Sequence, residues 1–432
     1  MRRPRVLFAT LLLLPAIVVS SGAASWGRGA PSAEPVTDLQ AVLDTASDGD
    51  TIRLGPGVYR ATPRAFRDPL CGNCVEHRTP VEASVGFRVV GMAIVLIGAG
   101  PAETTLITGA GYGMYFEDAG GSAVENLSVT GGRRDPDGNA TDAAIVVRGG
   151  AVRLRDLWIR DNTDRVEDVV VGIAGVVGRE GAEIEIRRCR ILNNGWDGIA
   201  LYRGAMATIA DNVIEGGRGA GIGITWDAAA LVVRNRISGY WKGIGTFGSS
   251  RAVVRNNAVF DNLGWGIIAT GDSFLEATHN VVVRNGNCGF AVWSEGASGR
   301  FADNVALENG WRKEWVCPRV GFWHRGRQER FPVDRNLVDG NVFGAWRSET
   351  GEEAVGPLLE ENPRFRGPVD FRPGPRSPLA DGGDPEGTDR DGSRSDLGLS
   401  GGAAGRSGLG APPRSLPAER HRIGSAAWEE TR

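Results

Sequence analysis

The sequence is poor in several features, and each scarcity excludes a class of protein. Only two of its 49 basic residues are lysines, and they are scattered rather than gathered in a basic tract. The formal net charge is −3, so nucleic acid is not an expected partner. After residue 19 no apolar run approaches the length of a membrane span, which argues against an integral membrane protein.

The one long apolar run lies near the N-terminus. Three arginines precede residues 6–19, which are apolar, and small residues follow at 20–25. This order is typical of a secretory signal, and the run is too short for a comfortable span. We expect residues 1–24 to be a signal peptide and the mature protein to be secreted or periplasmic. An uncleaved N-terminal anchor is the alternative.

Helical periodicity is missing from residues 189–310, and a short repeated phrase takes its place. An Asn followed by two mostly aliphatic residues returns at steps of 23, 23, 22, 23 and 24 residues, with Cys in the first copy: Cys189, Asn212, Asn235, Asn257, Asn280 and Asn304. A Gly-Ile or Gly-Phe pair follows about nine residues after each of the first five copies. Such a period predicts a solenoid.

The repeat unit consists of short apolar strands separated by Asn and Gly corners. We therefore expect an all-β fold, a right-handed parallel β-helix with about 23 residues per coil, closed by a short N-terminal helix at residues 38–44. The recurring Asn should form an amide ladder, and the aliphatic positions should stack inside. A leucine-rich repeat has a similar period, but the leucine framework and helical segment that it needs are missing.

Both ends of the chain carry phrases that resemble the pectate-lyase-like superfamily of β-helical proteins. Residues 50–59 read Asp-Thr-Ile-Arg-Leu-Gly-Pro-Gly-Val-Tyr, and residues 362–398 contain Asn-Pro-x-Phe, Ser-Pro-x-x-Asp and Asp-x-Gly motifs. The resemblance covers residues 36–402 and implies one β-helical domain. It is specific for the fold and weak for activity. We expect residues 403–432 to be a disordered tail.

Residues 311–336 interrupt the repeat and are rich in Trp and Arg, so we expect an inserted flap. Cys317 in this segment follows Cys288 by 29 residues, little more than one coil, and a disulfide between them is plausible. A loop disulfide is expected for Cys71 and Cys74 in an exported chain, while Cys189 should be a buried free thiol.

Two columns of residues are candidates for a site on the outside of the coil. When the coils are aligned on the Gly-Ile pair, an outward column contains Tyr202, Phe247 and Trp293, with Trp226 beside it; Trp241 and Trp265 lie near the second column. Such an aromatic stripe could stack on the faces of sugar rings. The alternative is an aromatic face that the flap covers.

The second column contains Asp197 and Lys242, two coils apart. Some β-helical polysaccharide lyases pair a Lys base with an Arg acid, so the resemblance makes Lys242 a candidate base and Arg203 or Arg218 a candidate acid. Glycoside hydrolases of this fold use clustered carboxylates, but no tight Asp pair occurs in the repeats. The Trp-Ile-Asp-His phrase of pectate lyases and the Asp-Pro-His phrase of β-helical epimerases are also missing.

One loop resembles a calcium ligand set, because oxygen ligands alternate along it and a Gly turns the chain. Its candidate ligands are Asp135, Asp137, Asn139 and Asp142. A second candidate runs from Asp389 to Asp396. Calcium is therefore a possible cofactor, although neither loop matches a full twelve-residue motif.

Together these patterns predict a monomeric exported β-helix that binds a polysaccharide along one long face. The leading hypothesis adds cleavage of a uronate glycan by β-elimination. The alternative is a non-catalytic binding or scaffold protein, for which an aromatic stripe is sufficient.

Overall fold

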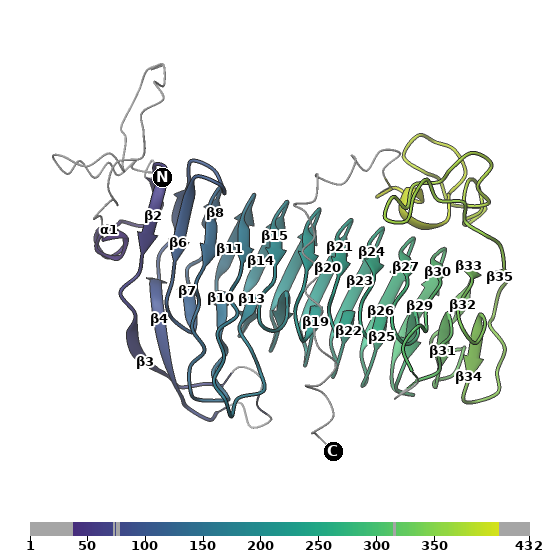
Figure 1. Cartoon of the computed structure of the whole chain (residues 1–432), viewed down its shortest axis with the longest axis horizontal. Coiled ribbons are helices and arrows are strands. Elements are labelled where there is room, and N and C mark those ends of the chain that lie inside the picture. Colours follow the sequence, from purple (N-terminus) through teal and green to yellow (C-terminus); the bar gives the residue numbers. More distant parts are fainter. Residues whose placement is uncertain (1–37, 72–73, 75–77, 314–316, 406–432) are drawn as a thin grey trace.

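A computed structural model shows a parallel β-helix whose strands stack along one long axis (Figure 1). It describes residues 38–405 except 72–73, 75–77 and 314–316. The expected signal peptide and nearly all of the expected tail lie outside the described residues. Each complete coil contributes one strand to each of three sheets, and one further strand near the N-terminus pairs antiparallel at the edge of one sheet.

The three sheets follow one another around the coil in the order C, A, B. Sheet A contains 11 strands: β1 (Asp50–Arg53), β5 (Ile94–Ile97), β8 (Ser122–Glu125), β11 (Ala151–Arg155), β14 (Glu183–Arg187), β17 (Met206–Ala210), β20 (Ala229–Val233), β23 (Arg251–Arg255), β26 (Phe274–Thr278), β29 (Ser298–Ala302) and β32 (Val333–Asp334). Sheet B contains 12 strands: β2 (Gly57–Arg60), β6 (Thr104–Ile107), β9 (Ser128–Thr130), β12 (Trp158–Arg160), β15 (Arg190–Leu192), β18 (Val213–Glu215), β21 (Arg236–Ser238), β24 (Ala258–Phe260), β27 (Val281–Val283), β30 (Val305–Leu307), β33 (Asn336–Asp339) and β35 (Leu358–Leu359). Sheet C also contains 12 strands: β3 (Arg64–Asp68), β4 (Val81–Val90), β7 (Tyr112–Glu117), β10 (Ala143–Arg148), β13 (Ala174–Arg179), β16 (Ile199–Leu201), β19 (Ala220–Ile224), β22 (Lys242–Thr246), β25 (Trp265–Ala269), β28 (Phe290–Val292), β31 (Phe322–His324) and β34 (Trp346–Ser348).

The core consists of aliphatic columns that the strand register stacks directly. Sheet B pairs Ile191 with Ile214, then Ile237, Val259 and Val282, and all five side chains are buried. Parallel strands place equivalent residues about 4.8 Å apart, so each repeat continues the column of the one before. The predicted all-β fold and its internal aliphatic column are confirmed.

The predicted asparagine ladder occupies the corner between sheets A and B. The side-chain nitrogens of Asn212, Asn235, Asn257, Asn280 and Asn304 each donate to the side-chain oxygen of the next Asn, at 2.9 to 3.0 Å. The residue before each Asn has left-handed backbone geometry, with φ of 62° at Asp211 and 56° at Arg234. This corner leaves backbone groups that the strand ladder cannot pair, and the Asn amides satisfy them.

A second ladder lies at the corner between sheets B and C, where Asn262, Asn285, Asn309 and Asn341 are linked in the same way. It is interrupted at two coils, where Gly217 and Tyr240 occupy the equivalent turns. The buried Tyr240 ring fills the space beside Gly217, because a Cβ there would overlap the ring. The Tyr240 backbone N–H still donates to Asn262, so a bulky ring replaces the amides without breaking the coil.

A helix covers the N-terminal end of the β-helix, and the C-terminal segment packs against one of its faces. The predicted N-terminal helix is confirmed as α1 (Leu39–Thr45), whose Leu39 and Leu43 join the main core, and Asp38 caps it by accepting from Gln40 and Ala41 N–H groups. Near the other end, the segment that follows β35 folds back beside β27, β30 and β33 (Figure 1). It packs Phe371, Leu379, Leu397 and Leu399 on the outside of sheet B. The short 3₁₀-helix Gly398–Ser400 belongs to this segment.

The flap expected at residues 311–336 is smaller in the structure. β31 and β32 lie inside this range and continue sheets C and A, so the coil resumes by Phe322. The sequence missed this coil because its corners are long and carry Trp and Arg in place of the repeated phrase. The described residues 311–313 and 317–320 belong to the insertion, and Cys317 and Val320 are part of a cluster on the outer face of sheet C.

The asparagine ladder gives a direct stability test. Asn257→Ala removes an oxygen that accepts two hydrogen bonds from Asn235 and a nitrogen that donates to Asn280 and to two backbone carbonyls. Because these buried partners are left unsatisfied, we expect the free energy of unfolding to fall by about 2–4 kcal/mol. Urea denaturation measures this change. The exposed Ser249→Ala is the control, and an unchanged midpoint for Asn257→Ala would refute a stabilising ladder.

Candidate functional site

The predicted site residues lie on or beside the outer face of sheet C, in the columns expected from the sequence. Strand register places Asp197, Ala220, Lys242, Trp265 and Cys288 in one column at the strand starts. The column at the strand ends contains Tyr202, Thr225, Phe247, Thr270 and Trp293, because the residues before them are paired and point into the core. Between the two columns the outward residues of three successive coils are small, and we refer to this strip, with aromatic residues beside it, as the sheet C groove.

The floor of the groove is made of very small residues. Ala200, Gly223 and Gly245 occupy the outward position of three successive coils. A Cβ at Gly223 would lie 3.7 Å from Asp197 Oδ2, and one at Gly245 would lie 3.3 Å from Lys242 Cδ. The two charged side chains therefore extend over the glycines, which leave room for them and for a ligand above.

Asp197 is a carboxylate with one oxygen fixed and one open to the groove. Its Oδ1 accepts from the Ala220 backbone N–H at 2.5 Å, and Oδ2 has no hydrogen-bond donor among the described residues. Burial raises the pKa of the Asp197 carboxyl to about 6, while the Ala220 N–H and the Lys242 charge act in the opposite direction. Lys242 forms no ion pair within the described part of the chain, so its ammonium is available to a bound anion.

The two arginines proposed as acid partners have other contacts. Arg203 donates to the Cys74 carbonyl, and its guanidinium lies 5.2 Å from the centre of the Trp226 ring. Arg218 lies over Trp196 at 5.7 Å. Burial lowers the pKa of both arginines. Arg203 thus holds the Cys71–Cys74 loop against the coil, whereas Arg218 lies at the strand-start rim.

Aromatic residues at the strand ends form one wall of the groove. Phe247 is 50% exposed and contacts Trp226 edge to face, with ring centres 6.0 Å apart. Tyr202 is only 8% exposed, since it packs under the loop that carries Cys71 and Cys74. The two cysteines form the expected disulfide. The strand-end column is thus exposed at Phe247 and covered at Tyr202, where the cover is this loop and not the flap expected from the sequence.

A row of tryptophans crosses the C-terminal end of the groove, from Trp241 and Trp265 at the strand starts to Trp293 at a strand end and Trp323 in the middle of β31. Trp241 contacts Trp265 edge to face at 5.6 Å, Trp265 contacts Trp293 at 5.8 Å, and Trp293 contacts Trp323 at 5.0 Å. Trp265 is only 7% exposed. This tryptophan row is the end wall of the groove, and Trp323 was not singled out from the sequence because it lies in the coil that the repeat pattern missed.

A cavity of about 270 Å³ lies at the other end of the groove. Thr141, Asp142, Trp196 and Tyr202 line it together with residues around Asn139 and Val171. Burial raises the pKa of Asp142 to about 7, although Arg134 forms a buried ion pair with it. Loops from distant coils build this cavity, and no local sequence signal marks them as neighbours.

The candidate calcium ligands are spread over separate contacts. Asp135 accepts from the Ser84 N–H and hydroxyl, Asp137 from Glu82 and Asn139 N–H groups, and Asp142 from Arg134. Among the described residues, no group of three or more His, Cys, Asp or Glu side chains could hold a metal ion. In the second loop, Asp389 accepts from the backbone of Asp396 and Gly402. Calcium at these loops stays a prediction, and the contacts described here stabilise them without an ion.

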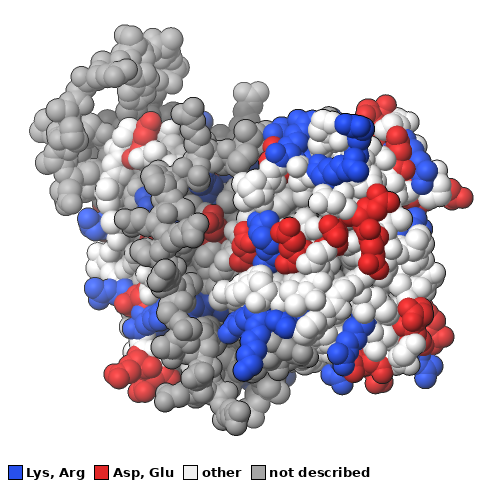
Figure 2. Space-filling model, turned by 45° about the vertical axis from the view of Figure 1, so that its right-hand side comes forward, with Lys and Arg blue, Asp and Glu red and all other residues white. Residues whose placement is uncertain are grey.

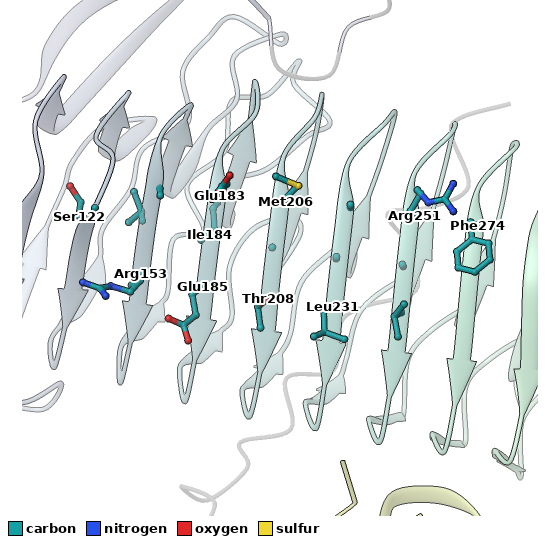
Figure 3. Close-up of a pocket in the computed structure, with 18 residues that line it drawn as sticks. Ser122, Arg153, Glu183, Ile184, Glu185, Met206, Thr208, Leu231, Arg251 and Phe274 are labelled. Atoms are coloured by element: carbon teal, nitrogen blue, oxygen red, sulfur yellow. The ribbon is translucent and has the colours of Figure 1, made fainter. Parts of the chain in front are cut away.

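A wider groove lies on sheet A, and Figure 3 shows its lining. Met206 and Leu231 are exposed there, at 49% and 41%, between coils that carry Glu183, Glu185 and Arg251. Glu185 accepts ion pairs from Arg155 and Arg187, which lower its pKa although burial raises it. The lowered pKa of Glu185 contrasts with the raised pKa of Asp197 in the sheet C groove.

The visible charged residues occur in small groups of both signs, without a broad region of one charge (Figure 2). On the face shown, the basic residues do not form a continuous stripe. None of the described helices is long and apolar enough to cross a membrane.

Comparisons with known proteins place the fold. Residues 172–343 match the family model described as right handed beta helix region, and no curated protein matches the sequence. The A-module of mannuronan C-5 epimerase AlgE4 from Azotobacter vinelandii has 15% identity and a TM-score of 0.53, covering 74% of this chain and 89% of its own. Pectate lyase Pel9A has 12% identity and a TM-score of 0.45, and the match covers 83% of this chain and 89% of the Pel9A chain. At these identities the likeness is one of fold.

The raised pKa of Asp197 predicts a pH-dependent stability change. The folded state favours the protonated carboxyl, so the contribution of Asp197 to stability is present below about pH 4 and is lost as the pH rises past about 6. Asp197→Asn keeps an oxygen that accepts from the Ala220 N–H. Because the amide does not ionise, the variant does not lose stability as the pH rises. We expect its free energy of unfolding to exceed that of the parent by about 1–2 kcal/mol at neutral pH, with the difference vanishing in acid. The exposed Asp227→Asn is the control, and a pH-independent difference would contradict the raised pKa.

Proposed function

Because the chain is a right-handed parallel β-helix of the pectate-lyase-like kind, we propose that it binds an acidic polysaccharide in the sheet C groove. We further propose that Asp197 and Lys242 transfer a proton on a uronate ring of that polymer. The observation that carries this proposal is the open Asp197 Oδ2 beside unpaired Lys242, over a glycine floor with aromatic residues beside it.

The groove has the parts that recognition of an acidic glycan needs. The exposed Phe247 ring, with Trp226 packed against it edge to face, offers an apolar face on which the C–H side of a sugar ring can stack. Gly223 and Gly245 keep the floor low, so the ring can approach the backbone. Lys242 supplies a cation that forms no ion pair within 4 Å among the described residues. A uronate carboxylate at Lys242 would place the neighbouring ring carbons above Asp197 and the glycines.

The protonation states favour Asp197 as the base, in place of the Lys242 base predicted from the sequence. With a pKa of about 6, Asp197 is mostly ionised at neutral pH and still basic enough to accept a carbon-bound proton. Lys242 then neutralises the uronate carboxylate as negative charge develops on it. Removal of the C5 proton is helped because this carboxylate, adjacent to C5, accepts the electron pair and is stabilised by the ammonium.

Two outcomes can follow from the same carbanion. Loss of the glycosidic oxygen at C4 gives β-elimination and an unsaturated chain end, whereas return of a proton to the opposite face inverts C5. The only described carboxylate in the outward columns from β16 to β28 is Asp197, so the second carboxylate that hydrolysis requires is not provided there. The likeness to AlgE4 is one of fold, and the proton-transfer proposal depends on Asp197 and Lys242.

Binding without chemistry is the second candidate function. The aromatic walls need no acid or base beside them, and Arg203, one of the expected acid partners, is engaged with the Cys74 carbonyl. The same groove would then hold the glycan as a binding or scaffold protein. We propose an exported location for either function, based on the residues expected to form the signal peptide.

The catalytic proposal is tested with a panel of uronate polysaccharides in D2O. Deuterium incorporation at C5, detected by NMR, reports proton abstraction, and the ultraviolet absorbance of unsaturated ends separates elimination from inversion. We expect Asp197→Asn and Lys242→Ala each to lower the rate by about 100-fold or more. Lys313→Ala is the matched control, because Lys313 is the other lysine and is exposed. Glycan binding without deuterium incorporation or unsaturated ends would refute catalysis and favour the binding function.

The aromatic wall gives a separate prediction for affinity. Trp226→Ala and Phe247→Ala should each raise the dissociation constant for the bound glycan about fivefold, since each removes a stacking surface worth about 1 kcal/mol. Isothermal titration calorimetry measures this effect. Leu231→Ala on sheet A removes an exposed apolar side chain from another face and should leave affinity unchanged. Equal effects of all three variants would argue against the sheet C groove.

A further inference from the structure

Two cysteines lie against each other at the closed end of sheet C. Cys288 lies two residues before the start of β28, and Cys317 lies in the segment between β30 and β31. Their Sγ atoms are 2.9 Å apart, and both side chains are buried. In the structure both are buried thiols, as is Cys189.

The surroundings of the pair favour a sulfur–sulfur bond over a metal site. Cys288 and Cys317 belong to an apolar cluster with Trp265, Val320 and Trp323. A metal would need further ligands, and no group of three candidate ligands occurs in the described part of the chain. Burial also raises the pKa of the Cys288 thiol, so a thiolate ligand would be costly there.

We propose that Cys288 and Cys317 form a disulfide in the mature protein. The reaction is thiol–disulfide exchange with a small oxidised disulfide: both thiols give up their protons, two electrons pass to the oxidant, and the oxidant leaves as two thiols. Cys71 and Cys74 are joined by a disulfide in the same chain, which requires an oxidising environment. Cys189 is buried in the asparagine-ladder corner and remains a thiol.

The bond would join the starts of adjacent coils. Between Cys288 and Cys317 the chain passes through β28, β29 and β30, so one full coil separates them in sequence. Elsewhere in the described β-helix, neighbouring coils are held by hydrogen bonds and packing. A covalent link here fixes Cys317–Val320 against the tryptophan row and thereby fixes the end wall of the groove. This inference does not depend on what the groove binds.

A count of free thiols decides the question. The chain has five cysteines, and two disulfides use four of them, so alkylation of the denatured, unreduced protein should modify one residue, Cys189. If Cys71–Cys74 is the only disulfide, three residues are modified instead. The protein is purified from an oxidising compartment, or refolded with oxidised glutathione, and peptides are mapped by mass spectrometry without reduction. A peptide joining Cys288 to Cys317 is expected, and three alkylated cysteines would overturn the proposal.

Matched variants keep the test informative. Cys288→Ser should leave Cys317 as an added reactive thiol, while Cys189→Ser should leave none. Hydrogen exchange provides a second measurement on the intact parent protein. Reduction should speed exchange of the amides at residues 317–323 and leave those of β17 and β20 unchanged. Equal exchange at residues 317–323 before and after reduction would also count against the disulfide.

Discussion

The parallel hydrogen-bond ladder is the interaction on which the rest of this structure depends. It fixes neighbouring coils at about 4.8 Å and in one register, so every residue has an equivalent directly above and below. Aliphatic side chains then form continuous columns, and one amide can bond to the next. The Asn257 side chain is useful because Asn235 and Asn280 lie one coil away on either side. Without the backbone ladder, the aliphatic contacts and amide bonds of one coil would not continue into the next.

The groove arises where the repeat becomes irregular. On sheet C, the outward positions are bulky near both ends and small at Ala200, Gly223 and Gly245. The second asparagine ladder is interrupted in the same coils, where Gly217 and Tyr240 replace the amides. A repeat selected only for stability would have Asn in place of Gly217 and Tyr240, and larger side chains in place of Gly223 and Gly245. The interruption instead leaves a low, polar-lined space with Asp197 and Lys242 above it.

The two ends of this groove are closed by non-repeating segments in different ways. Toward the N-terminus, the Cys71–Cys74 loop is held by Arg203 and covers Tyr202. Toward the C-terminus, the tryptophan row packs under the segment that contains Cys317. Both closures cover aromatic residues that the repeat alone would expose. They explain why the strand-end column is exposed at Phe247 and buried at Tyr202, and why Trp265 in the strand-start column is also buried.

The sequence by itself determined the fold and the columns, since a step of 22 to 24 residues and a fixed Asn specify which residues stack. It therefore placed Asp197, Lys242 and Phe247 on one face, but it could not assign their roles. Tertiary structure decided that Arg203 binds a loop carbonyl, that Asp142 lines a cavity and that a further coil lies within residues 311–336. The physical reason is that periodicity encodes contacts between equivalent positions of neighbouring coils, whereas loops contact residues far away in sequence. Burial and charge, which set the pKa of Asp197, follow from those long-range contacts.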